Sequence, residues 1–299
     1  MFLFSRWPLI YTTPSGWSDK RSYIKKMDKE LLKEILSIPS KSGNELKLVN
    51  FICEFLKKNK IPYKVDDLFN IYCTKGNADM YPCVVGQTNT EQEYIYNIDV
   101  KTEYKNNTNN ELKEAFKGYT RRGKPFRFGF DKAGVFACLT LLLELPVLKA
   151  TFFVSDKLSC FGTIAADPIF FENVGYTIKF DNPHDPLKPN FFFGFNPFSD
   201  DKSNNSEFSQ KVNIVLQDNT IQEYALRGHS FDNAIMSSFD FCGTNLSIGY
   251  YNYCSSDEYV VIEDVEKVIN IGKKMIEKLG FEKYKCPKKE EIKFINWEY

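Results

Sequence analysis

The sequence predicts an α/β fold with a central mixed, mostly parallel sheet flanked by helices on both faces. Its 299 residues, 43% of them apolar and 16% aromatic, suffice for one domain with a full hydrophobic core. Short apolar segments typical of strands alternate with longer segments in which apolar residues recur at helical spacing. This alternation is typical of a sheet that is covered by helices on both sides.

The folded part begins with two helices and then two groups of strands. Apolar residues at helical spacing predict helices over residues 31–36 and 46–56. Ser42 followed three residues later by Glu45 predicts a capping box at the start of the second helix. The segments KIPYKVDDLFNIYCTKG and YPCVVGQTN then predict strands separated by turns.

The second half of the chain continues the alternation. An aromatic-rich stretch with many Asn, Asp, Pro and Ser residues interrupts it and predicts a loop. In order, we expect a helix at 131–145, strands at 150–154 and 175–180, the loop at 182–205, a strand at 246–251 and a helix at 265–279 with Asp264 in a capping role.

The chain divides into an N-terminal arm at residues 1–26, an α/β domain at 27–283 and a C-terminal tail at 284–299. The arm is aromatic, basic and nearly free of acid, and Pro8, Pro14 and Gly16 interrupt any regular pattern. It is compatible with a docking segment or a mitochondrial presequence.

Composition excludes several classes of function. The 39 basic residues balance 39 acidic residues, so no nucleic-acid partner is expected. The longest apolar run, at 135–148, is interrupted by polar residues and Pro146, so no transmembrane segment is expected. Eight cysteines without a CxxC pair indicate reduced, mostly buried thiols in an intracellular protein, either cytoplasmic or in a viral or organellar assembly.

Several motifs fall in the order of one known family. They are IPSKSGNE, YPCVVGQTNTE, GFDKAGVFACL, ATFFVSDKLSCFG, VGYTIKFD and GYYNYCSSDEY. Over about residues 30–280 the sequence resembles the peptidase-T-like superfamily of two-zinc aminopeptidases and tripeptidases. The resemblance is to its compact members, which implies no separate lid domain.

The resemblance also implies where zinc ligands would lie, and most of these positions are changed. Gln87 and Asn89 stand at the histidine and aspartate of the His-x-Asp-Thr motif, and amides are poor zinc ligands. Phe130 stands at the aspartate that bridges the two metals. Lys157 stands at a ligand glutamate, and an ammonium repels a dication.

Three positions keep some chemistry. Asp156 stands at the glutamate that acts as general base, Asp181 is a retained ligand, and Cys254 replaces the last ligand, a histidine. The sequence has only two histidines, His184 and His229, and both lie outside the motifs. The same residues also have plain structural interpretations: Asp156 with Lys157 as a local charge pair, and Cys254 as a small buried residue.

Residues that support the fold are retained. Lys132, Ala133 and Gly134 match the close helix packing of the family. We therefore predict a catalytically inactive homologue, not an enzyme and without a cofactor, that serves as a structural subunit of a larger assembly. Its protein partners are expected at the N-terminal arm and the Phe191–Phe198 loop.

Two alternatives remain open. One is an active hydrolase with an altered site, in which Asp181, Cys254 and His184 hold a metal and Asp156 acts as base. The other is a sensor that binds a peptide without cleaving it.

Overall fold

The computed structural model describes residues 27–90, 98–106, 110–125, 129, 132–184, 191–192, 207–219, 222–223, 239 and 241–285. The predicted arm and all but the first two residues of the predicted tail lie outside the described residues, as do Phe130 and residues 193–198 of the predicted docking loop.

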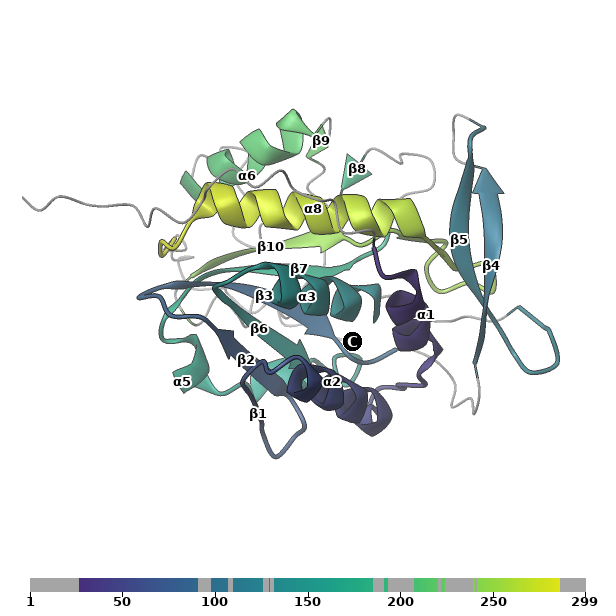
Figure 1. Cartoon of the computed structure of the whole chain (residues 1–299), viewed down its shortest axis with the longest axis horizontal. Coiled ribbons are helices and arrows are strands. Elements are labelled where there is room, and N and C mark those ends of the chain that lie inside the picture. The colour runs from purple at the N-terminus through teal and green to yellow at the C-terminus, as the bar shows by residue number, and fades with distance from the viewer. Residues whose placement is uncertain are drawn as a thin grey trace, which may run out of the picture.

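A six-stranded sheet forms the centre of the molecule (Figure 1). The order across it is β1-β2-β6-β3-β7-β10; β6, β3, β7 and β10 run parallel, whereas β1 and β2 pair antiparallel at one edge. This confirms the predicted mixed, mostly parallel sheet. The strands are β1 Tyr63–Val65, β2 Ile71–Lys75, β3 Tyr81–Gln87, β6 Leu148–Phe153, β7 Val174–Asn182 and β10 Cys242–Ser247.

Long helices cover one face of this sheet, and α8 lies across it with α6 beyond (Figure 1). Buried residues from these helices and the sheet form the main hydrophobic core. The predicted close packing at α3 is confirmed, because a Cβ on Gly134 would lie 1.9 Å from the carbonyl oxygen of Phe180 on β7. The helices are α1 Lys29–Ser37, α2 Leu46–Lys58, α3 Ala133–Glu144, α6 Glu207–Asp218 and α8 Ile262–Leu279.

Among the described residues, the opposite face has a thinner cover. The short helices α4 (Phe161–Ile164) and α5 (Pro168–Phe171) follow β6 there. Phe171 stacks on Phe241 with ring centroids 6.0 Å apart, within a smaller aromatic core. None of the helices within the described residues is both long and apolar enough to cross a bilayer.

A second sheet of four antiparallel strands lies at one end of the molecule (Figure 1). Its order is β11-β12-β5-β4, and its β4–β5 hairpin projects beyond the body. This hairpin has no counterpart among the elements predicted from the sequence. The strands are β4 Asp99–Asn106, β5 Leu112–Tyr119, β11 Tyr250–Tyr251 and β12 Tyr259–Val261.

Four predicted elements need correction. Helix α8 begins at Ile262, so Asp264 lies within its first turn rather than at its cap. The residue preceding α2 is Glu45 rather than Ser42, and the Glu45 carboxylate accepts a hydrogen bond from the distant Ser155 N–H instead of closing a capping box. The strand predicted at 246–251 is two strands, since the backbone turns at Gly249 (φ 80°). The predicted loop at 182–205 includes a two-residue strand β8 (Phe191–Phe192) that pairs with β9 (Gln222–Glu223).

Candidate functional site

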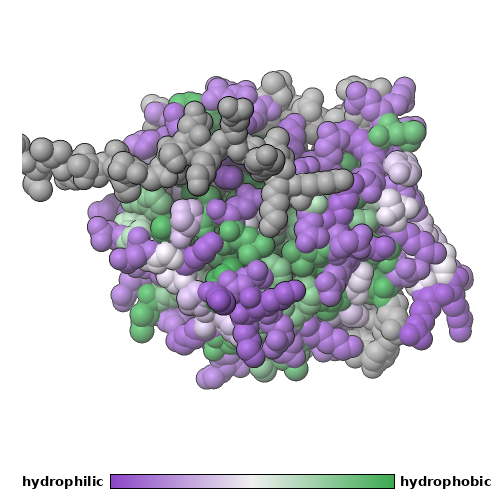
Figure 2. Space-filling model, in the orientation of Figure 1, coloured by the Kyte–Doolittle hydropathy of each residue, from purple (hydrophilic) through white to green (hydrophobic). Residues whose placement is uncertain are grey.

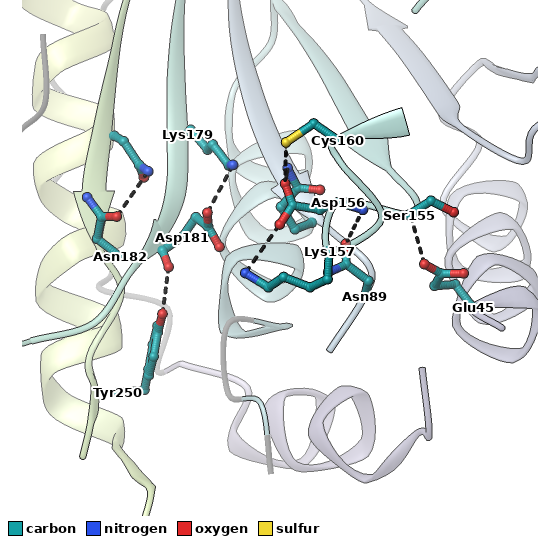
Figure 3. A network of polar contacts seen from close by, with 12 residues as sticks. Glu45, Asn89, Ser155, Asp156, Lys157, Cys160, Lys179, Asp181, Asn182 and Tyr250 are labelled. Atoms are coloured by element: carbon teal, nitrogen blue, oxygen red, sulfur yellow. Dashed lines mark hydrogen bonds and ion pairs between the residues drawn. The ribbon is translucent and has the colours of Figure 1, made fainter. Parts of the chain in front are cut away.

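Polar side chains meet at the carboxyl ends of three neighbouring parallel strands, where α/β proteins commonly place their functional groups. Gln87 ends β3, Asp156 follows β6 by three residues, and Asp181 lies near the end of β7. Figure 3 shows these strand ends and the polar contacts between them. We call this group the strand-end cluster: Gln87, Asn89, Asp156, Lys157, Lys179 and Asp181.

Two buried amides hold Asp156 in place. Gln87 Nε2 donates to Asp156 Oδ1 at 3.3 Å, and the Asp156 N–H donates to Asn89 Oδ1 at 3.1 Å. Both amide residues are fully buried. Two of the positions that the resemblance assigns to metal ligands therefore contact the residue at the general-base position. Figure 3 shows the contact of Asn89 with Asp156.

Two more groups approach the Asp156 carboxylate from its own loop. Lys157 Nζ lies 3.3 Å from Oδ2, and Cys160 Sγ donates to Oδ1 at 3.5 Å. The predicted local charge pair of Asp156 with Lys157 is thus present. Ser155, Ser159 and Cys160 all have left-handed backbone conformations, with φ of 57°, 57° and 55°. Such strain persists only where surrounding contacts hold it, so this loop is tightly determined.

Glu45 fixes the start of that loop from the neighbouring helix. Its carboxylate, on a residue that is 5% exposed, accepts the hydrogen bond from the Ser155 N–H at 2.7 Å (Figure 3). Burial raises the pKa of Glu45, and its hydrogen bonds to backbone N–H groups oppose that rise. Glu45 consequently positions the residue that precedes Asp156.

The second carboxylate pairs with a lysine from its own strand. Lys179 and Asp181 are two residues apart on β7, so their side chains share one face of the sheet. Lys179 Nζ lies 2.9 Å from Asp181 Oδ2, and the lysine side chain is only 3% exposed (Figure 3). Lys179 was not among the predicted site residues, although the alternation of side chains in IKFDN places the two charges on the same face of the strand.

The remaining predicted site residues lie elsewhere. Cys254 is exposed in the turn between β11 and β12, so the prediction of a buried thiol is wrong. His184 is buried, with Nδ1 3.0 Å from the Tyr251 hydroxyl, which donates to Asp264 Oδ2 at 2.6 Å. Among the described residues, no three of His, Cys, Asp and Glu come close enough to hold a metal ion.

Burial sets the charge state of this histidine. Removal from water lowers the pKa of His184 to about 4, although the nearby Asp264 carboxylate opposes the shift. His184 is therefore a neutral core residue at neutral pH, in contact with Tyr251.

The charges of the strand-end cluster balance. Its two carboxylates each contact an ammonium group within 3.3 Å. A protonated lysine donates hydrogen bonds and has no lone pair for a metal. The chemistry that this arrangement favours is mutual neutralisation of fixed charges.

Solved structures of peptidases share this fold. Aminopeptidase PepT from Bacillus cereus matches with a TM-score of 0.64 at 11% identity, over 84% of this chain and 97% of its own. A tripeptidase from Staphylococcus aureus matches with the same TM-score and identity, over 83% of this chain and 96% of its own. The chain has the fold of these peptidases. No protein-family model and no curated protein matches the sequence.

A third match is an assembling peptidase. The TET1 peptidase of Pyrococcus horikoshii, which forms a tetrahedron or a large octahedral shell, matches with a TM-score of 0.55 at 16% identity, over 85% of this chain and 99% of its own. The fold implied by the sequence resemblance is confirmed. The prediction that the chain is not an enzyme is contradicted, because these proteins of the same fold are themselves peptidases.

Proposed function

We propose that this chain is a structural subunit of a larger assembly, built on a peptidase fold whose two metal positions are closed by lysine–aspartate ion pairs. The observation that carries the proposal is the pairing of Lys157 with Asp156 and of Lys179 with Asp181. A structural role of this kind does not depend on hydrolysis.

The residues of the strand-end cluster do not fit a two-zinc centre. Gln87 and Asn89 offer amides where the resemblance implies an imidazole and a carboxylate, and zinc binds the latter groups far better. Two ammonium groups beside the site repel a dication. To bind zinc through Asp181, the site would have to displace the buried Lys179 ammonium, which lies 2.9 Å from the carboxylate.

The assembly role has support from the comparisons and from the sequence. The matching TET1 peptidase assembles into closed shells. Residues 1–26 and the Phe191–Phe198 segment remain the proposed docking segments. A chain that starts at Met27 should fold and yet be incorporated less well; normal incorporation would show that the arm does not dock.

Peptide hydrolysis is the second candidate function. The matching peptidases favour it, as does Asp156, which keeps a carboxylate at the position of the catalytic base. It predicts cleavage of short peptides that is lost in Asp156→Asn. Cleavage that survives this substitution would come from a contaminant or another site.

Zinc content tests the structural proposal. The protein is incubated with excess zinc, desalted and analysed for metal. We expect less than about a tenth of an equivalent in the wild type, because a catalytic zinc needs about three protein ligands. A variant with Gln87→His, Asn89→Asp and Lys157→Glu should gain zinc, whereas the surface control Lys64→Glu should not. One or more equivalents in the wild type would overturn the proposal.

A further inference from the structure

The exposed edge of the second sheet carries a charge pattern that is complementary to itself. β4 pairs only with β5 among the described strands, so its other edge has unpaired backbone groups. Asp99, Lys101, Glu103 and Lys105 alternate in charge along one face of β4, and Thr102 lies at their centre. The end of the molecule that carries this hairpin is largely hydrophilic (Figure 2).

We propose that β4 pairs antiparallel with β4 of a second copy of this chain, about a two-fold axis at Thr102. In that register Lys101 lies opposite the second copy's Glu103, and Lys105 lies opposite its Asp99. Directly opposite residues in antiparallel strands have Cβ atoms about 5 Å apart, so each contact joins opposite charges. The two four-stranded sheets become one continuous sheet.

The charge pattern selects this register over its neighbours. A shift by two residues in one direction places Lys101 opposite Lys101 of the second copy, and Asp99 opposite its Glu103. A shift by two residues in the other direction places Glu103 opposite Glu103 of the second copy, and Lys101 opposite its Lys105. Both shifts set like charges against each other, which is destabilising. A shift by one residue exchanges the two faces of the strand.

Within the chain, none of these charges lies directly opposite a charge of the other sign. On β5, Lys117 lies directly opposite Lys101, and Lys113 lies directly opposite Lys105. The β5 lysines pair elsewhere, Lys117 with Asp257 and Lys113 with Asp264. The ion pairs of the β4 charges run along their own strand, Lys101 with Asp99 at 3.5 Å and Lys105 with Glu103 at 2.8 Å, and the Tyr119 hydroxyl on β5 donates to Glu103. A second copy supplies the missing cross-strand carboxylates.

The other face of β4 also gains from the pairing. Tyr104 is 68% exposed on the single chain. In the two-fold register it lies opposite Val100 of the second copy, which is itself buried in its own chain, so the surface that the pairing would cover on this face is the Tyr104 ring. Thr102, which is exposed, lies opposite Thr102 of the second copy. The charged residues alone would also suit an edge guarded against aggregation, and the order of their signs is what favours a specific partner.

Exchange of charged residues between two copies tests the inference. The inference rests on the proposed assembly role, of which the β4 pairing would be one contact. By light scattering we expect the wild type at twice the chain mass of 34.8 kDa, or an even multiple of it. The variants Lys101→Glu and Glu103→Lys should each scatter as particles of half that mass. Mixed together, the two variants should associate again, because every opposed pair then joins unlike charges. The exposed helix residue Lys57 provides the control, Lys57→Glu, which should keep the wild-type mass.

A cross-link provides a second measurement. Thr102→Cys places one thiol opposite its own copy, so a disulfide-linked dimer should form under oxidising conditions, beyond the background from the exposed Cys254. A monomeric wild type, single variants of unchanged mass, or a mixture that fails to associate would overturn the inference. Zinc content is independent of all these masses, so failure here is distinguishable from failure of the proposed closure of the metal positions.

Discussion

The strand-end cluster and the β4 edge use the same chemistry, lysine beside carboxylate, in opposite surroundings. Lys179 is 3% exposed beside Asp181, whereas Lys101 is 52% exposed beside Asp99. Buried charges depend on their partner because water is absent, while exposed pairs contribute little because water and salt screen them. Burial, rather than residue type, therefore distinguishes charged pairs that stabilise the fold from charged residues that can bind a second molecule.

One chain of contacts joins these two regions. His184 follows the end of β7 and contacts Tyr251 of the second sheet. Tyr251 donates to Asp264 of α8, and Asp264 lies 3.4 Å from Lys113 on β5. These contacts run from the end of β7 to β5, the strand beside β4, through the buried His184 and Tyr251 and the partly buried Asp264 and Lys113.

Removal of the most buried ammonium should have the largest effect. Lys179→Met leaves the Asp181 carboxylate without its cation, and we expect the free energy of unfolding to fall by about 3–5 kcal/mol. Urea denaturation followed by circular dichroism measures it. Adding Asp181→Asn should recover part of the loss; equal losses in the single and double variants would mean that the packing of Lys179, not its charge, stabilises the fold.

Acid should lower the free energy of unfolding through protonation of His184. The pKa of His184 is 6.5 in the unfolded chain and about 4 in the folded one, so the unfolded state binds the proton first as pH falls. Stability should therefore decline from about pH 6.5 and level off below about pH 4, by roughly 3 kcal/mol in total. Tyr251, Asp264 and Lys267 surround the imidazole and act on its charge.

The comparison protein for this pH series is His184→Gln. Its unfolding free energy, measured at the same pH values, should decline less than that of the wild type over this interval. Parallel curves would assign the acid sensitivity to carboxylates elsewhere.

The second ion pair of the cluster should matter less. Lys157 is 28% exposed, and Asp156 retains its hydrogen bonds from Gln87 and Cys160 when the ammonium is removed. Lys157→Met should lower the unfolding free energy by about 1 kcal/mol. A loss as large as that of Lys179→Met would show that exposure does not rank these pairs.

The exposed edge should contribute least to the stability of the single chain. Lys101→Gln, at dilutions where the chain is monomeric, should change the unfolding free energy by no more than about 0.5 kcal/mol. Thermal unfolding at several protein concentrations measures it. A larger loss that is independent of concentration would place Lys101 in the fold rather than at an interface.

The sequence predicted the main sheet because its strands are short, buried apolar runs. β3 lies within a predicted strand segment, and β6 and β7 overlap the strands predicted at 150–154 and 175–180. The β4–β5 hairpin escaped prediction because its alternating residues are charged rather than apolar, and Val100 is its clearest apolar signal on β4. Helix α6 was also missed, although Phe208, Val212, Val215 and Leu216 show helical spacing.

The site was predictable in position but not in its contacts. The resemblance located Gln87, Asn89, Asp156 and Asp181 at strand ends, which the structure brings to one edge of the sheet. The bond from Ser155 to Glu45 joins residues 110 positions apart and displaced the predicted capping box. No local pattern indicates such a contact. Lys179, in contrast, was recoverable from the alternation of β7 alone.

The strand order has a consequence for synthesis on the ribosome. β3 lies between β6 and β7, and both of these strands follow it in the chain. Every residue of β3 is buried in the finished fold. Until residue 182 has emerged, this apolar strand has at least one open edge, and such exposed segments are prone to aggregate. The nascent chain should therefore depend on chaperones over a long stretch of translation.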